Sequence, residues 1–588
     1  MTAAAAPSAR PQDRPATLAV LTEWTYERHG PEVTALRHRA ADGTWRTGTY
    51  ADLRDRVRGT GRALLDLRVA PGERVAVLAE TRPEWTYTYF AVLAVGAVLV
   101  PVYPSAGEEE LAWVLSDSEA VVVVCDDPAQ AARVAAVRDR LPKLRETVLM
   151  DDLTREGAGG PAELLARAAA VPATADAAII YTSGTTGPPK GCRLTHANFG
   201  AVQDALLPLV PGGPGDSTYL YLPLAHVLAQ LIQFTAFLSG AELCYFGGRI
   251  EDVVTELAEA RPTHLPSVPR LFEKVHATVL ALAESQEGGR TRFDEAVRIG
   301  VLAAEGRLPA ELKAAHEAAE AALFAPVRAA LGGRLRWALT GAAPIDPAVL
   351  DFLRACGLVV HEGYGMTETA GVISANHTGA ARPGTVGRPI DGCEVRIAED
   401  GEILVRGPMV FPGYHNNPEA TAEVLDADGW LRTGDLGALD EDGYLRITGR
   451  KKEIVITSAG KNLSPTEVEF AIQRSRYVSR AVMIGDRRPH PVALITLDAE
   501  EIAAWAAREG LAPGDLGPVP GAHPAVRALV TEAVEAANAT VSRPARIRAF
   551  HILPEDLSIE AGTLTPTLKL RRRAVAERYA QEIEALYD

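Results

Sequence analysis

The sequence predicts an α/β protein: a large N-terminal domain of doubly wound sheets with a β-rich subdomain, and a small α+β C-terminal domain on a hinge. Three observations lead to this prediction. Short apolar runs alternate with segments of helical periodicity over most of the chain, as in parallel sheets whose strands are joined by helices. From Thr385 to Gly449 the pattern changes to short strands and turns. A basic stretch, Gly449–Glu453, then precedes a second, smaller alternating region.

These changes of pattern give the domain boundaries that we expect. Residues 1–17, rich in Ala, Pro and Arg, are predicted to be a flexible tail. Residues 18–449 are predicted to form the large domain, of which 385–449 is the β-rich part. Residues 450–588 are predicted to form the small, mobile domain.

The individual elements follow from periodicity and from turn residues. Helical spacing is clearest at 51–67, 108–116 and 228–238, and the alanine-rich stretch 286–331 predicts solvated helices on the surface. At the start of another helix, we expect Ser464 to be the N-cap, followed by Pro465 and by Glu467 at the third helical position. The buried strands expected in the large domain are 74–79, 120–125, 177–180, 217–222, 241–246, 263–268, 335–339 and 358–361. Those expected in the β-rich part and the small domain are 393–397, 402–406, 444–448, 480–484 and 492–497.

Charge and cysteine usage exclude several classes of protein. The net charge of −16 argues against a nucleic-acid partner and against strong electrostatic docking on anionic membranes. Peripheral membrane contact stays open, as does the choice between a monomer and a homodimer. The five cysteines are scattered without CxxC spacing, which favours a reducing compartment. The N-terminus has no apolar core of a signal peptide, so we expect a cytoplasmic protein.

The stretch Tyr181–Gly191, Y-T-S-G-T-T-G-P-P-K-G, follows a predicted strand and has the composition of a phosphate-binding loop. Its glycines allow backbone N–H groups to face an anion, its hydroxyls add donors, and Lys190 adds a positive charge. It differs from a Walker loop, because Lys190 is followed by Gly191 and preceded by two prolines that prevent a helix from starting there. Read alone, it would more often be a polar surface turn.

Further stretches carry polar and charged residues that are ordinary when taken singly. They are H-E-G-Y-G-M-T-E-T (361–369), T-G-D (433–435), G-R-K-K-E (449–453) and T-P-T-L-K-L-R-R-R (565–573). Read one at a time, they are a turn with a capped helix, a turn aspartate, a solvated charge run and a basic patch. Only eight lysines occur in the chain, and several of them fall in these stretches.

In this order, the stretches resemble the adenylate-forming superfamily of acyl-CoA synthetases, aryl-CoA ligases, luciferases and peptide-synthetase adenylation domains. The resemblance covers essentially the whole chain after the tail. Y-L-P-L-A-H-V-L-A-Q (221–230), S-V-P-R-L-F-E-K-V (267–275) and the helical stretch are most similar to the long-chain fatty acyl-CoA synthetases. The resemblance implies a Mg²⁺-dependent ligase. A fatty acid would attack the α-phosphate of ATP to give acyl-AMP and pyrophosphate, and coenzyme A would then displace AMP.

The resemblance also implies the site residues. Glu368 would bind Mg²⁺ together with Thr182, Thr367 would contact the α-phosphate, Tyr364 would stack on adenine, and Asp435 with Arg450 would hold the ribose. Lys569 would be the catalytic lysine of adenylation, with Glu368 and Thr182 as the other catalytic residues. The full set expected to bind ATP or AMP is Thr182, Ser183, Gly184, Thr185, Thr186, Gly187, Lys190, Gly341, Ala342, Ala343, Glu362, Gly363, Tyr364, Gly365, Met366, Thr367, Asp435, Arg450 and Lys569.

Two residues have roles outside the nucleotide site in this resemblance. Lys452 would be the hinge about which the small domain turns between half-reactions, and His226 would line the acyl pocket near the carboxylate. A buried histidine with satisfied hydrogen bonds is a nearly equal alternative for His226. Many relatives have a lysine where this chain has Ile456, so a nucleotide contact there is missing.

Other functions stay open at this point. The acyl-adenylate could be transferred to the thiol of a carrier protein, or the acid could be aromatic or of medium length. A catalytically weak nucleotide- or lipid-binding protein is an alternative from another class, although every expected catalytic position is filled. Acyl chain length cannot be read from the sequence, because pocket and core residues have the same apolar pattern.

Overall fold

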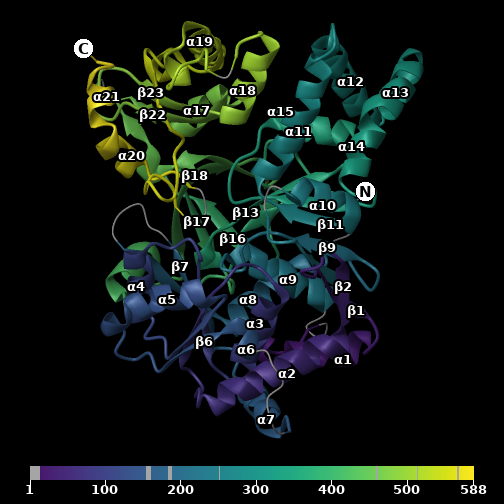
Figure 1. The fold of residues 1–588 in the computed structure, drawn as a ribbon, viewed down its shortest axis with the longest axis vertical. Coiled ribbons are helices and arrows are strands. Elements are labelled where there is room, and N and C mark those ends of the chain that lie inside the picture. The colour runs from purple at the N-terminus through teal and green to yellow at the C-terminus, as the bar shows by residue number, and fades with distance from the viewer. Residues whose placement is uncertain are drawn as a thin grey trace. The chain divides into compact units, whose positions relative to one another are not determined.

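The computed structural model describes residues 14–153, 160–182, 188–249, 252–458, 461–512, 514–565 and 569–587. The chain, drawn in Figure 1, is divided into two compact units. The second unit comprises Ile397–Ile403, Thr433–Ala438 and Ile447–Asp588, and the first unit comprises the rest. The structure confirms the predicted fold class, a mixed α/β protein whose two largest sheets are mostly parallel.

The first unit contains a six-stranded sheet of order β6-β5-β3-β4-β7-β8. Its strands pair in parallel, except β8, which is antiparallel to β7. The valine-rich strands β3 and β5 are almost fully buried, as expected of a parallel sheet covered on both faces. The strands are β3 Arg74–Leu78, β4 Val98–Val102, β5 Val122–Cys125, β6 Glu146–Leu149, β7 Asp176–Thr182 and β8 Lys190–Thr195. The helices of this region are α2 Tyr50–Asp66, α3 Pro83–Ala94, α4 Glu108–Asp117, α5 Pro128–Ala136, α6 Met150–Leu153 and α7 Ala162–Ala170.

A nine-stranded sheet of order β15-β14-β13-β12-β11-β9-β10-β1-β2 forms the rest of the core of this unit. Parallel strands run from β13 to β1, and antiparallel strands lie at both edges. Its strands are β1 Thr34–Arg39, β2 Trp45–Thr49, β9 Ser217–Leu220, β10 Glu242–Tyr245, β11 His264–Ser267, β12 Trp337–Thr340, β13 Val360–Tyr364, β14 Ser374–Ala375 and β15 Arg388–Pro389. The associated helices are α1 Leu21–His29, α8 His196–Leu206, α9 Val227–Ser239, α10 Val253–Ala260 and α15 Pro347–Ala355. Every strand predicted for the large domain coincides with one of these two sheets.

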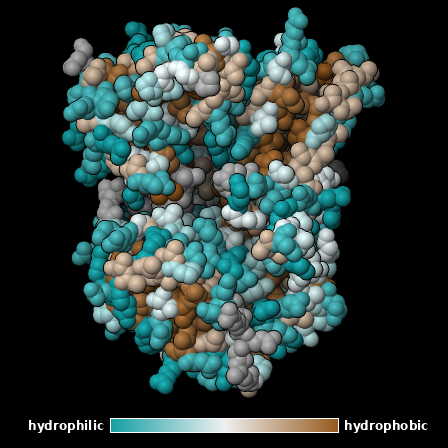
Figure 2. All heavy atoms as spheres, in the orientation of Figure 1, coloured by the Kyte–Doolittle hydropathy of each residue, from teal (hydrophilic) through white to brown (hydrophobic). Residues whose placement is uncertain are grey.

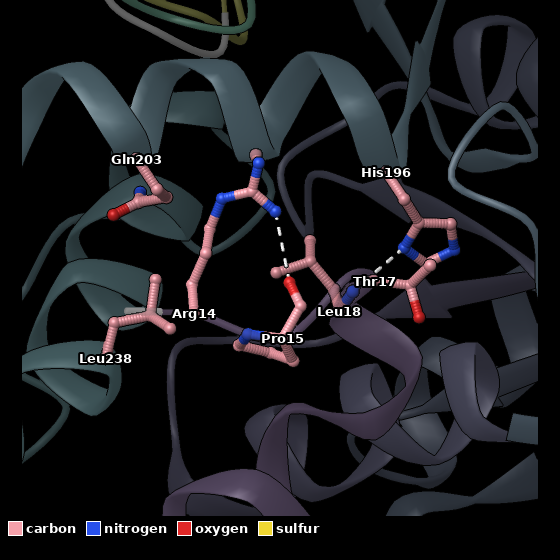
Figure 3. A pocket seen from close by; sticks show the side chains of 8 residues that line it. Arg14, Pro15, Thr17, Leu18, His196, Gln203 and Leu238 are labelled. Carbon is pink, nitrogen blue, oxygen red and sulfur yellow. Dashed lines mark hydrogen bonds between the residues drawn. The ribbon is translucent and has the colours of Figure 1, made fainter. Parts of the chain in front are cut away.

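Residues 14–17, predicted as the end of a flexible tail, pack instead against α8 (Figure 3). Arg14 makes two hydrogen bonds to Asp204, of 2.6 and 2.7 Å. A Cβ atom at Gly200 would lie 2.7 Å from the Arg14 guanidinium, so this glycine leaves room for the arginine. The backbone N–H of Leu18 donates to Nδ1 of His196 at 3.2 Å, beside a cavity of about 10 Å³, which is roughly one water molecule in size.

The alanine-rich stretch forms helices as predicted, but it is not simply a solvated surface segment. The helices of this stretch are α12 Gly289–Ala304, α13 Lys313–Ala319 and α14 Ala325–Ala330, and α11 Pro269–Glu284 directly precedes it. Phe293, Ile299 and Phe324 are buried, and Phe293 stacks on Phe352 of α15 with 5.5 Å between ring centroids. A Cβ at Gly300 would be 2.6 Å from that of Ala355, so α12 and α15 pack closely. Figure 2 shows hydrophobic side chains gathered over this helical region.

A four-stranded sheet of order β16-β17-β18-β19 corresponds to the predicted β-rich part, and its strands are divided between the two units. The strands are β16 Glu394–Ile397, β17 Glu402–Arg406, β18 Leu431–Leu439 and β19 Leu445–Arg450, and helix α16, Pro418–Val424, was not predicted. The second unit continues with the 3-10 turn η7 Lys451–Glu453, the short pair β20 Val455–Ile456 and β21 Asn462–Leu463, and a three-stranded sheet of order β22-β23-β24. Its remaining elements are α17 Pro465–Gln473, β22 Val478–Ile484, β23 Val492–Leu497, α18 Ala499–Arg508, α19 Pro524–Thr540, β24 Phe550–Ile552, α20 Arg572–Arg578 and α21 Ala580–Glu584.

The helix predicted to start at Ser464 begins there, but its capping differs from the prediction. Ser464 is the N-cap of α17 and Pro465 is the first helical residue, yet the serine side chain makes no capping bond. Its hydroxyl donates instead to the carbonyl of Thr448 at 3.1 Å, within the second unit. Over the described ranges, every helix is too short or too polar to cross a bilayer.

Candidate active site

Two predicted site loops lie side by side at the carboxyl ends of β12 and β13. Thr340 and Glu362 are paired across these strands, so the loops that follow them leave the same edge of the sheet. A Cβ at Gly341 would lie 3.0 Å from the carbonyl oxygen of Gly363. Ala342 has a φ of +67°, and Ala342 and Ala343 are exposed on this edge. The first unit therefore brings the predicted adenine-contacting segments together.

The second of these loops carries the Y-G-M-T-E-T stretch, and Gly365 has a steric role in it. A Cβ at Gly365 would lie 2.2 Å from the carbonyl oxygen of Gly371, so any side chain there would displace the backbone. The chain then forms a turn of 3-10 helix, η6 Thr367–Thr369, in which Thr367 and Glu368 are each 8% exposed. Met366 donates its N–H to the Thr369 hydroxyl at 3.3 Å and so fixes the start of this turn.

Glu368 and Thr182, the two predicted magnesium ligands, both lie against the thiol of Cys192 on β8. The Thr182 hydroxyl is 3.8 Å from the Cys192 sulfur. Burial, followed by the charge of Glu368, raises the pKa of the Cys192 thiol well above its usual value. The thiol therefore stays protonated beside the carboxylate. In the sequence, Cys192 is only one of five scattered cysteines, and nothing there indicates a place beside Glu368.

Tyr414 is a second residue that the sequence analysis missed. Its hydroxyl donates a 2.7 Å hydrogen bond to Oε1 of Glu368, and the Lys190 ammonium lies 5.2 Å from the centre of its ring. Burial, and then the charge of Glu368, raises the pKa of Tyr414 above its usual value, so the hydroxyl stays a donor. The segment of Tyr414 is fixed by two backbone hydrogen bonds to β8, from His415 to Gly191 and from Arg193 to Gly413. An aromatic residue in the turn G-Y-H-N-N-P was the only signal in the sequence.

This arrangement is suited to a hard divalent cation. Glu368 offers a buried carboxylate whose neighbours Tyr414 and Cys192 are neutral, and Thr182 offers a hydroxyl oxygen nearby. Carboxylate and hydroxyl oxygens are the ligands that Mg²⁺ prefers, usually together with phosphate oxygens and water. Within the described residues, no group of three or more His, Cys, Asp or Glu side chains is arranged as a metal site.

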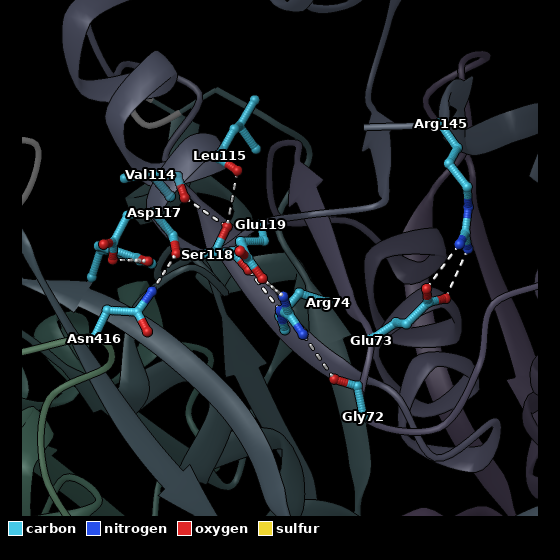
Figure 4. A network of polar contacts seen from close by, with 11 residues as sticks. Gly72, Glu73, Arg74, Val114, Leu115, Asp117, Ser118, Glu119, Arg145 and Asn416 are labelled. Carbon is cyan, nitrogen blue, oxygen red and sulfur yellow. Dashed lines mark hydrogen bonds and ion pairs between the residues drawn. The ribbon is translucent and has the colours of Figure 1, made fainter. Parts of the chain in front are cut away.

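Helix α4 contacts both described ends of the predicted phosphate loop. The Trp113 indole N–H donates to the Pro189 carbonyl at 2.9 Å, and the Tyr181 hydroxyl donates to Asp117 at 2.6 Å. Trp113 and Asp117 are four residues apart and so lie on one face of the helix. Asn416 donates to the Asp117 carbonyl at 3.1 Å, beside the polar contacts of Arg74, Ser118 and Glu119 (Figure 4). Ser183, Gly184, Thr185, Thr186 and Gly187 lie outside the described residues.

Two further groups at the sheet edge have unusual surroundings. Burial raises the pKa of Glu362 to about 7, although a backbone hydrogen bond from Gly384 opposes this rise. The Thr340 hydroxyl, at the last residue of β12, is buried and finds no hydrogen-bond partner in the described part of the chain. Such a buried, unsatisfied group next to a predicted adenine site points to a ligand contact.

The second unit holds the other predicted residues. Asp435 is buried and forms a 3.0 Å ion pair with Nε of Arg450. Lys451 is bound to Asp400 at 2.6 Å and to Glu402 at 2.9 Å, whereas Lys452 beside it is exposed. The backbone N–H of Lys569 donates to the Thr565 hydroxyl at 3.0 Å, and the Lys569 side chain is exposed.

His226 has a structural role in the first unit. It is the N-cap of α9, and its Nδ1 accepts a 3.2 Å hydrogen bond from the backbone N–H of Leu228. A histidine that caps a helix with one ring nitrogen fits the alternative of a satisfied, half-buried side chain. Its place in an acyl pocket stays a prediction.

Comparison with known proteins extends over almost the whole chain. The AMP-binding enzyme family matches residues 22–415, and the AMP-binding enzyme C-terminal domain matches residues 452–588. The chain is 41% identical over 587 residues to the long-chain-fatty-acid–CoA ligase FadD15 of Mycobacterium tuberculosis, covering 96% of each chain. It is 31% identical to the peroxisomal long chain acyl-CoA synthetase 7 of Arabidopsis thaliana, covering 96% of this chain and 85% of the relative.

Solved structures share the fold at lower identity. The anthranilate CoA ligase AuaEII in complex with anthranoyl-AMP has a TM-score of 0.72 and 20% identity, covering 97% of this chain and 98% of that one. The adenylation domain of a carboxylate reductase from Mycobacterium chelonae has a TM-score of 0.74 and 22% identity, covering 97% of this chain and 91% of that one. These comparisons confirm the resemblance that the sequence motifs indicated. The chain belongs to the AMP-binding enzyme family.

Proposed function

We propose that this protein is a long-chain fatty acid–CoA ligase that works through an acyl-adenylate. The observation that carries the proposal is the 41% identity over nearly the full length to a relative named as a long-chain-fatty-acid–CoA ligase. In the first half-reaction a fatty acid carboxylate attacks the α-phosphate of ATP and releases pyrophosphate. In the second, the thiol of coenzyme A attacks the acyl carbon and releases AMP.

The residues of the first unit would bind and orient ATP in this proposal. Lys190, Thr182 and the hydroxyls of the predicted phosphate loop would hold the β- and γ-phosphates, and Thr367 would contact the α-phosphate. Tyr364 would stack on adenine, beside Gly341, Ala342 and Ala343. Because phosphoryl transfer depends mainly on positioning and charge neutralisation, such a set of donors is the chief catalytic contribution that the protein needs to make.

Glu368 and Thr182 would hold Mg²⁺, and a bound Mg²⁺ would neutralise phosphate charge. The buried carboxylate of Glu368 beside the neutral Tyr414 and Cys192 supports this role. Tyr414 would orient one oxygen of Glu368 through its hydrogen bond, leaving the other oxygen for the cation.

The residues of the second unit would act on the ribose and on the reacting groups. Asp435 would accept hydrogen bonds from the ribose hydroxyls, held in place by Arg450. Lys569 would place its ammonium between the attacking carboxylate and the α-phosphate, where negative charge is greatest in the transition state. Lys452 would be the pivot by which the unit changes position between the half-reactions. A cytoplasmic location, which the five free cysteines suggest, is part of the same proposal.

A pyrophosphate-release assay over carboxylic acids of increasing chain length, with and without coenzyme A, tests this function. We expect release that depends on long-chain acids, and acyl-CoA as the product when coenzyme A is present. Acyl-AMP that forms but is not transferred to coenzyme A would favour a carrier-protein acceptor instead. Activity confined to aromatic or medium-chain acids would reject the long-chain assignment.

A further inference from the structure

A group of ion pairs around the buried carboxylate of Glu469 lies in the second unit and includes Arg572, three residues after Lys569. Arg572, the first residue of α20, makes two hydrogen bonds of 2.5 Å to the two oxygens of Glu469 on α17. Its Nε lies 3.6 Å from the carboxylate of Glu453. One guanidinium thus faces carboxylates from two other parts of the unit.

Glu469 connects this group to the three-stranded sheet. Its Oε1 also accepts the backbone N–H of Met483 on β22 at 2.6 Å, and its side chain is only 8% exposed. The carboxylate therefore receives three donors and has little freedom to move. Arg572 is held at a fixed position relative to the core of the unit.

Glu453 connects the same guanidinium to the predicted hinge. It is the last residue of η7 and directly follows Lys452 in the chain. Glu453 is half-buried, and its contact with Arg572 is longer than those of Glu469. It is therefore the contact that can be altered with the least harm to the core.

The segment Lys569–Arg571 leads straight into Arg572 and pairs with Thr563–Thr565. Thr565 and Lys569 exchange two hydrogen bonds, from the Thr565 N–H to the Lys569 carbonyl at 2.8 Å and from the Lys569 N–H to the Thr565 hydroxyl at 3.0 Å. Leu564 and Leu570 form an isolated β-bridge, and Arg571 donates to the Thr563 carbonyl at 2.9 Å. This backbone pairing holds Lys569–Arg571 against Thr563–Thr565, so a displacement of Arg572 would pass directly to Lys569.

An arginine is required for these contacts. Its planar fork meets both oxygens of Glu469 while Nε faces a second carboxylate, which the single ammonium of a lysine cannot do. Burial alone would lower the pKa of Arg572, but the two carboxylates outweigh it and the pKa is raised. The neighbouring Arg573 is different: it makes an exposed pair with Glu577 of its own helix, a contact of small energetic value.

We infer that Arg572 is a positioning residue that couples Glu453, directly after the predicted hinge residue Lys452, to the segment Lys569–Arg571, so that these two parts move as one piece. The inference rests on the proposed function, because it assigns Arg572 an effect on the step in which Lys569 takes part. Loss of the coupling leaves Lys569 chemically intact but poorly placed. Adenylation should therefore slow, while transfer of a preformed acyl group to coenzyme A, which does not need Lys569, should not.

The test compares Arg572→Lys and Glu453→Gln with the matched variants Arg573→Lys and Glu577→Gln from the same helix. Acid-dependent pyrophosphate release measures the first half-reaction, and acyl-CoA formation from supplied acyl-AMP measures the second. We expect Arg572→Lys to reduce kcat of the first by about tenfold or more, because small displacements of a catalytic group are costly, with KM for ATP nearly unchanged. Glu453→Gln should reduce kcat of the first half-reaction by about threefold. In both variants the rate of the second half-reaction should stay within about twofold of the wild type. The matched variants Arg573→Lys and Glu577→Gln should stay within about twofold of the wild type in both half-reactions.

Because Arg572→Lys weakens the pairing of a buried carboxylate, thermal unfolding is measured for each variant. If Arg572→Lys fails to fold, Glu453→Gln decides the question, since Glu469 keeps its partners in that variant. Equal loss of both half-reactions, or adenylation equal to that of the matched variants, would overturn the inference. A wild-type protein that releases no acid-dependent pyrophosphate would refute the proposed function itself, which is a separate outcome.

Discussion

The indole N–H of Trp113 donates a 2.9 Å hydrogen bond to the carbonyl oxygen of Pro189, which links α4 to the chain just before Lys190. Trp113 is 39% exposed, so the bond is not explained by burial of the ring. We predict that Trp113→Phe raises the dissociation constant for ATP by about three- to tenfold, the value of one hydrogen bond. Equilibrium binding measures this, and kcat at saturating ATP should stay near that of the wild type. Trp45→Phe is the control, because it removes an indole bond to Glu259. Equal ATP affinity in the two variants would contradict the prediction.

Tyr414→Phe separates the two contacts of Tyr414. It removes the hydroxyl that binds Glu368 and keeps the ring that faces Lys190. A hydrogen bond to a charged group contributes about 1.5–3 kcal/mol, so we expect Mg²⁺-dependent ATP affinity to fall about ten- to 100-fold. The dissociation constant for ATP, measured over a series of Mg²⁺ concentrations, gives this change in affinity. Tyr444→Phe, whose ring also faces arginines, should bind ATP normally. If Tyr414→Phe binds Mg²⁺ and ATP as the wild type does, Tyr414 does not position Glu368.

Glu362 should make stability depend on pH. Burial raises its pKa in the folded protein to about 7, against about 4.3 in an unfolded chain. The folded state then holds the proton more tightly. The associated stability is fully present below pH 4, and it is lost as the pH rises to about 7, by up to about 3 kcal/mol. Glutamine cannot ionise, so the stability of Glu362→Gln should lack this dependence on pH. At pH 8 this variant should be more stable than the wild type. Urea unfolding at pH 5 and 8 measures the difference, and parallel pH profiles for both proteins would contradict it.

Gly365→Ala should destabilise the protein, whatever its effect on nucleotide binding. The new Cβ would lie 2.2 Å from the Gly371 carbonyl oxygen, so the backbone has to move. Overpacking of this kind costs about 1–3 kcal/mol. Gly213→Ala is the comparison, because nothing lies within 4 Å of its Cβ position and its φ is not positive. Denaturant unfolding should show a loss for the first variant and a change within about 1 kcal/mol for the second. Similar stabilities would show that Gly365 has room for a side chain.

Lys569→Ala should abolish acyl-adenylate formation and largely spare the second half-reaction. Removing a group that stabilises transition-state charge costs about 100- to 1,000-fold in rate. Pyrophosphate release and thioester formation from supplied acyl-AMP measure the two steps separately. Lys461→Ala, which changes another exposed lysine of the same unit, should retain adenylation. Unchanged pyrophosphate release from Lys569→Ala would remove this lysine from the mechanism.

The sequence predicted the buried strands well, because continuous runs such as Val122–Cys125 have few alternatives to a parallel sheet. It did not predict the burial of Phe293 or the docking of Arg14 on α8, since both depend on partners distant in sequence. Among site residues, Glu368 and Thr182 were identified through motifs, and the structure places both against Cys192. Tyr414 and Trp113 were not identified, because a single aromatic residue in a turn or a helix has no pattern that distinguishes a positioning role from packing.

The ion pairs on both sides of Lys452 limit how the chain can bend there. Lys451 is held by Asp400 and Glu402, and Glu453 faces Arg572, while Lys452 itself is exposed. If the small unit turns at the predicted hinge, these contacts would concentrate backbone rotation in the φ and ψ angles of Lys452. Lys452→Pro, which fixes φ, would act on a single bond and should impair one half-reaction more than the other. If the pivot is restricted to these two torsions, one substitution at Lys452 would be enough to hold the small unit in its position for adenylation or in its position for thioester formation. Inhibitors of the two half-reactions could then be sought independently, each with a variant held in one position.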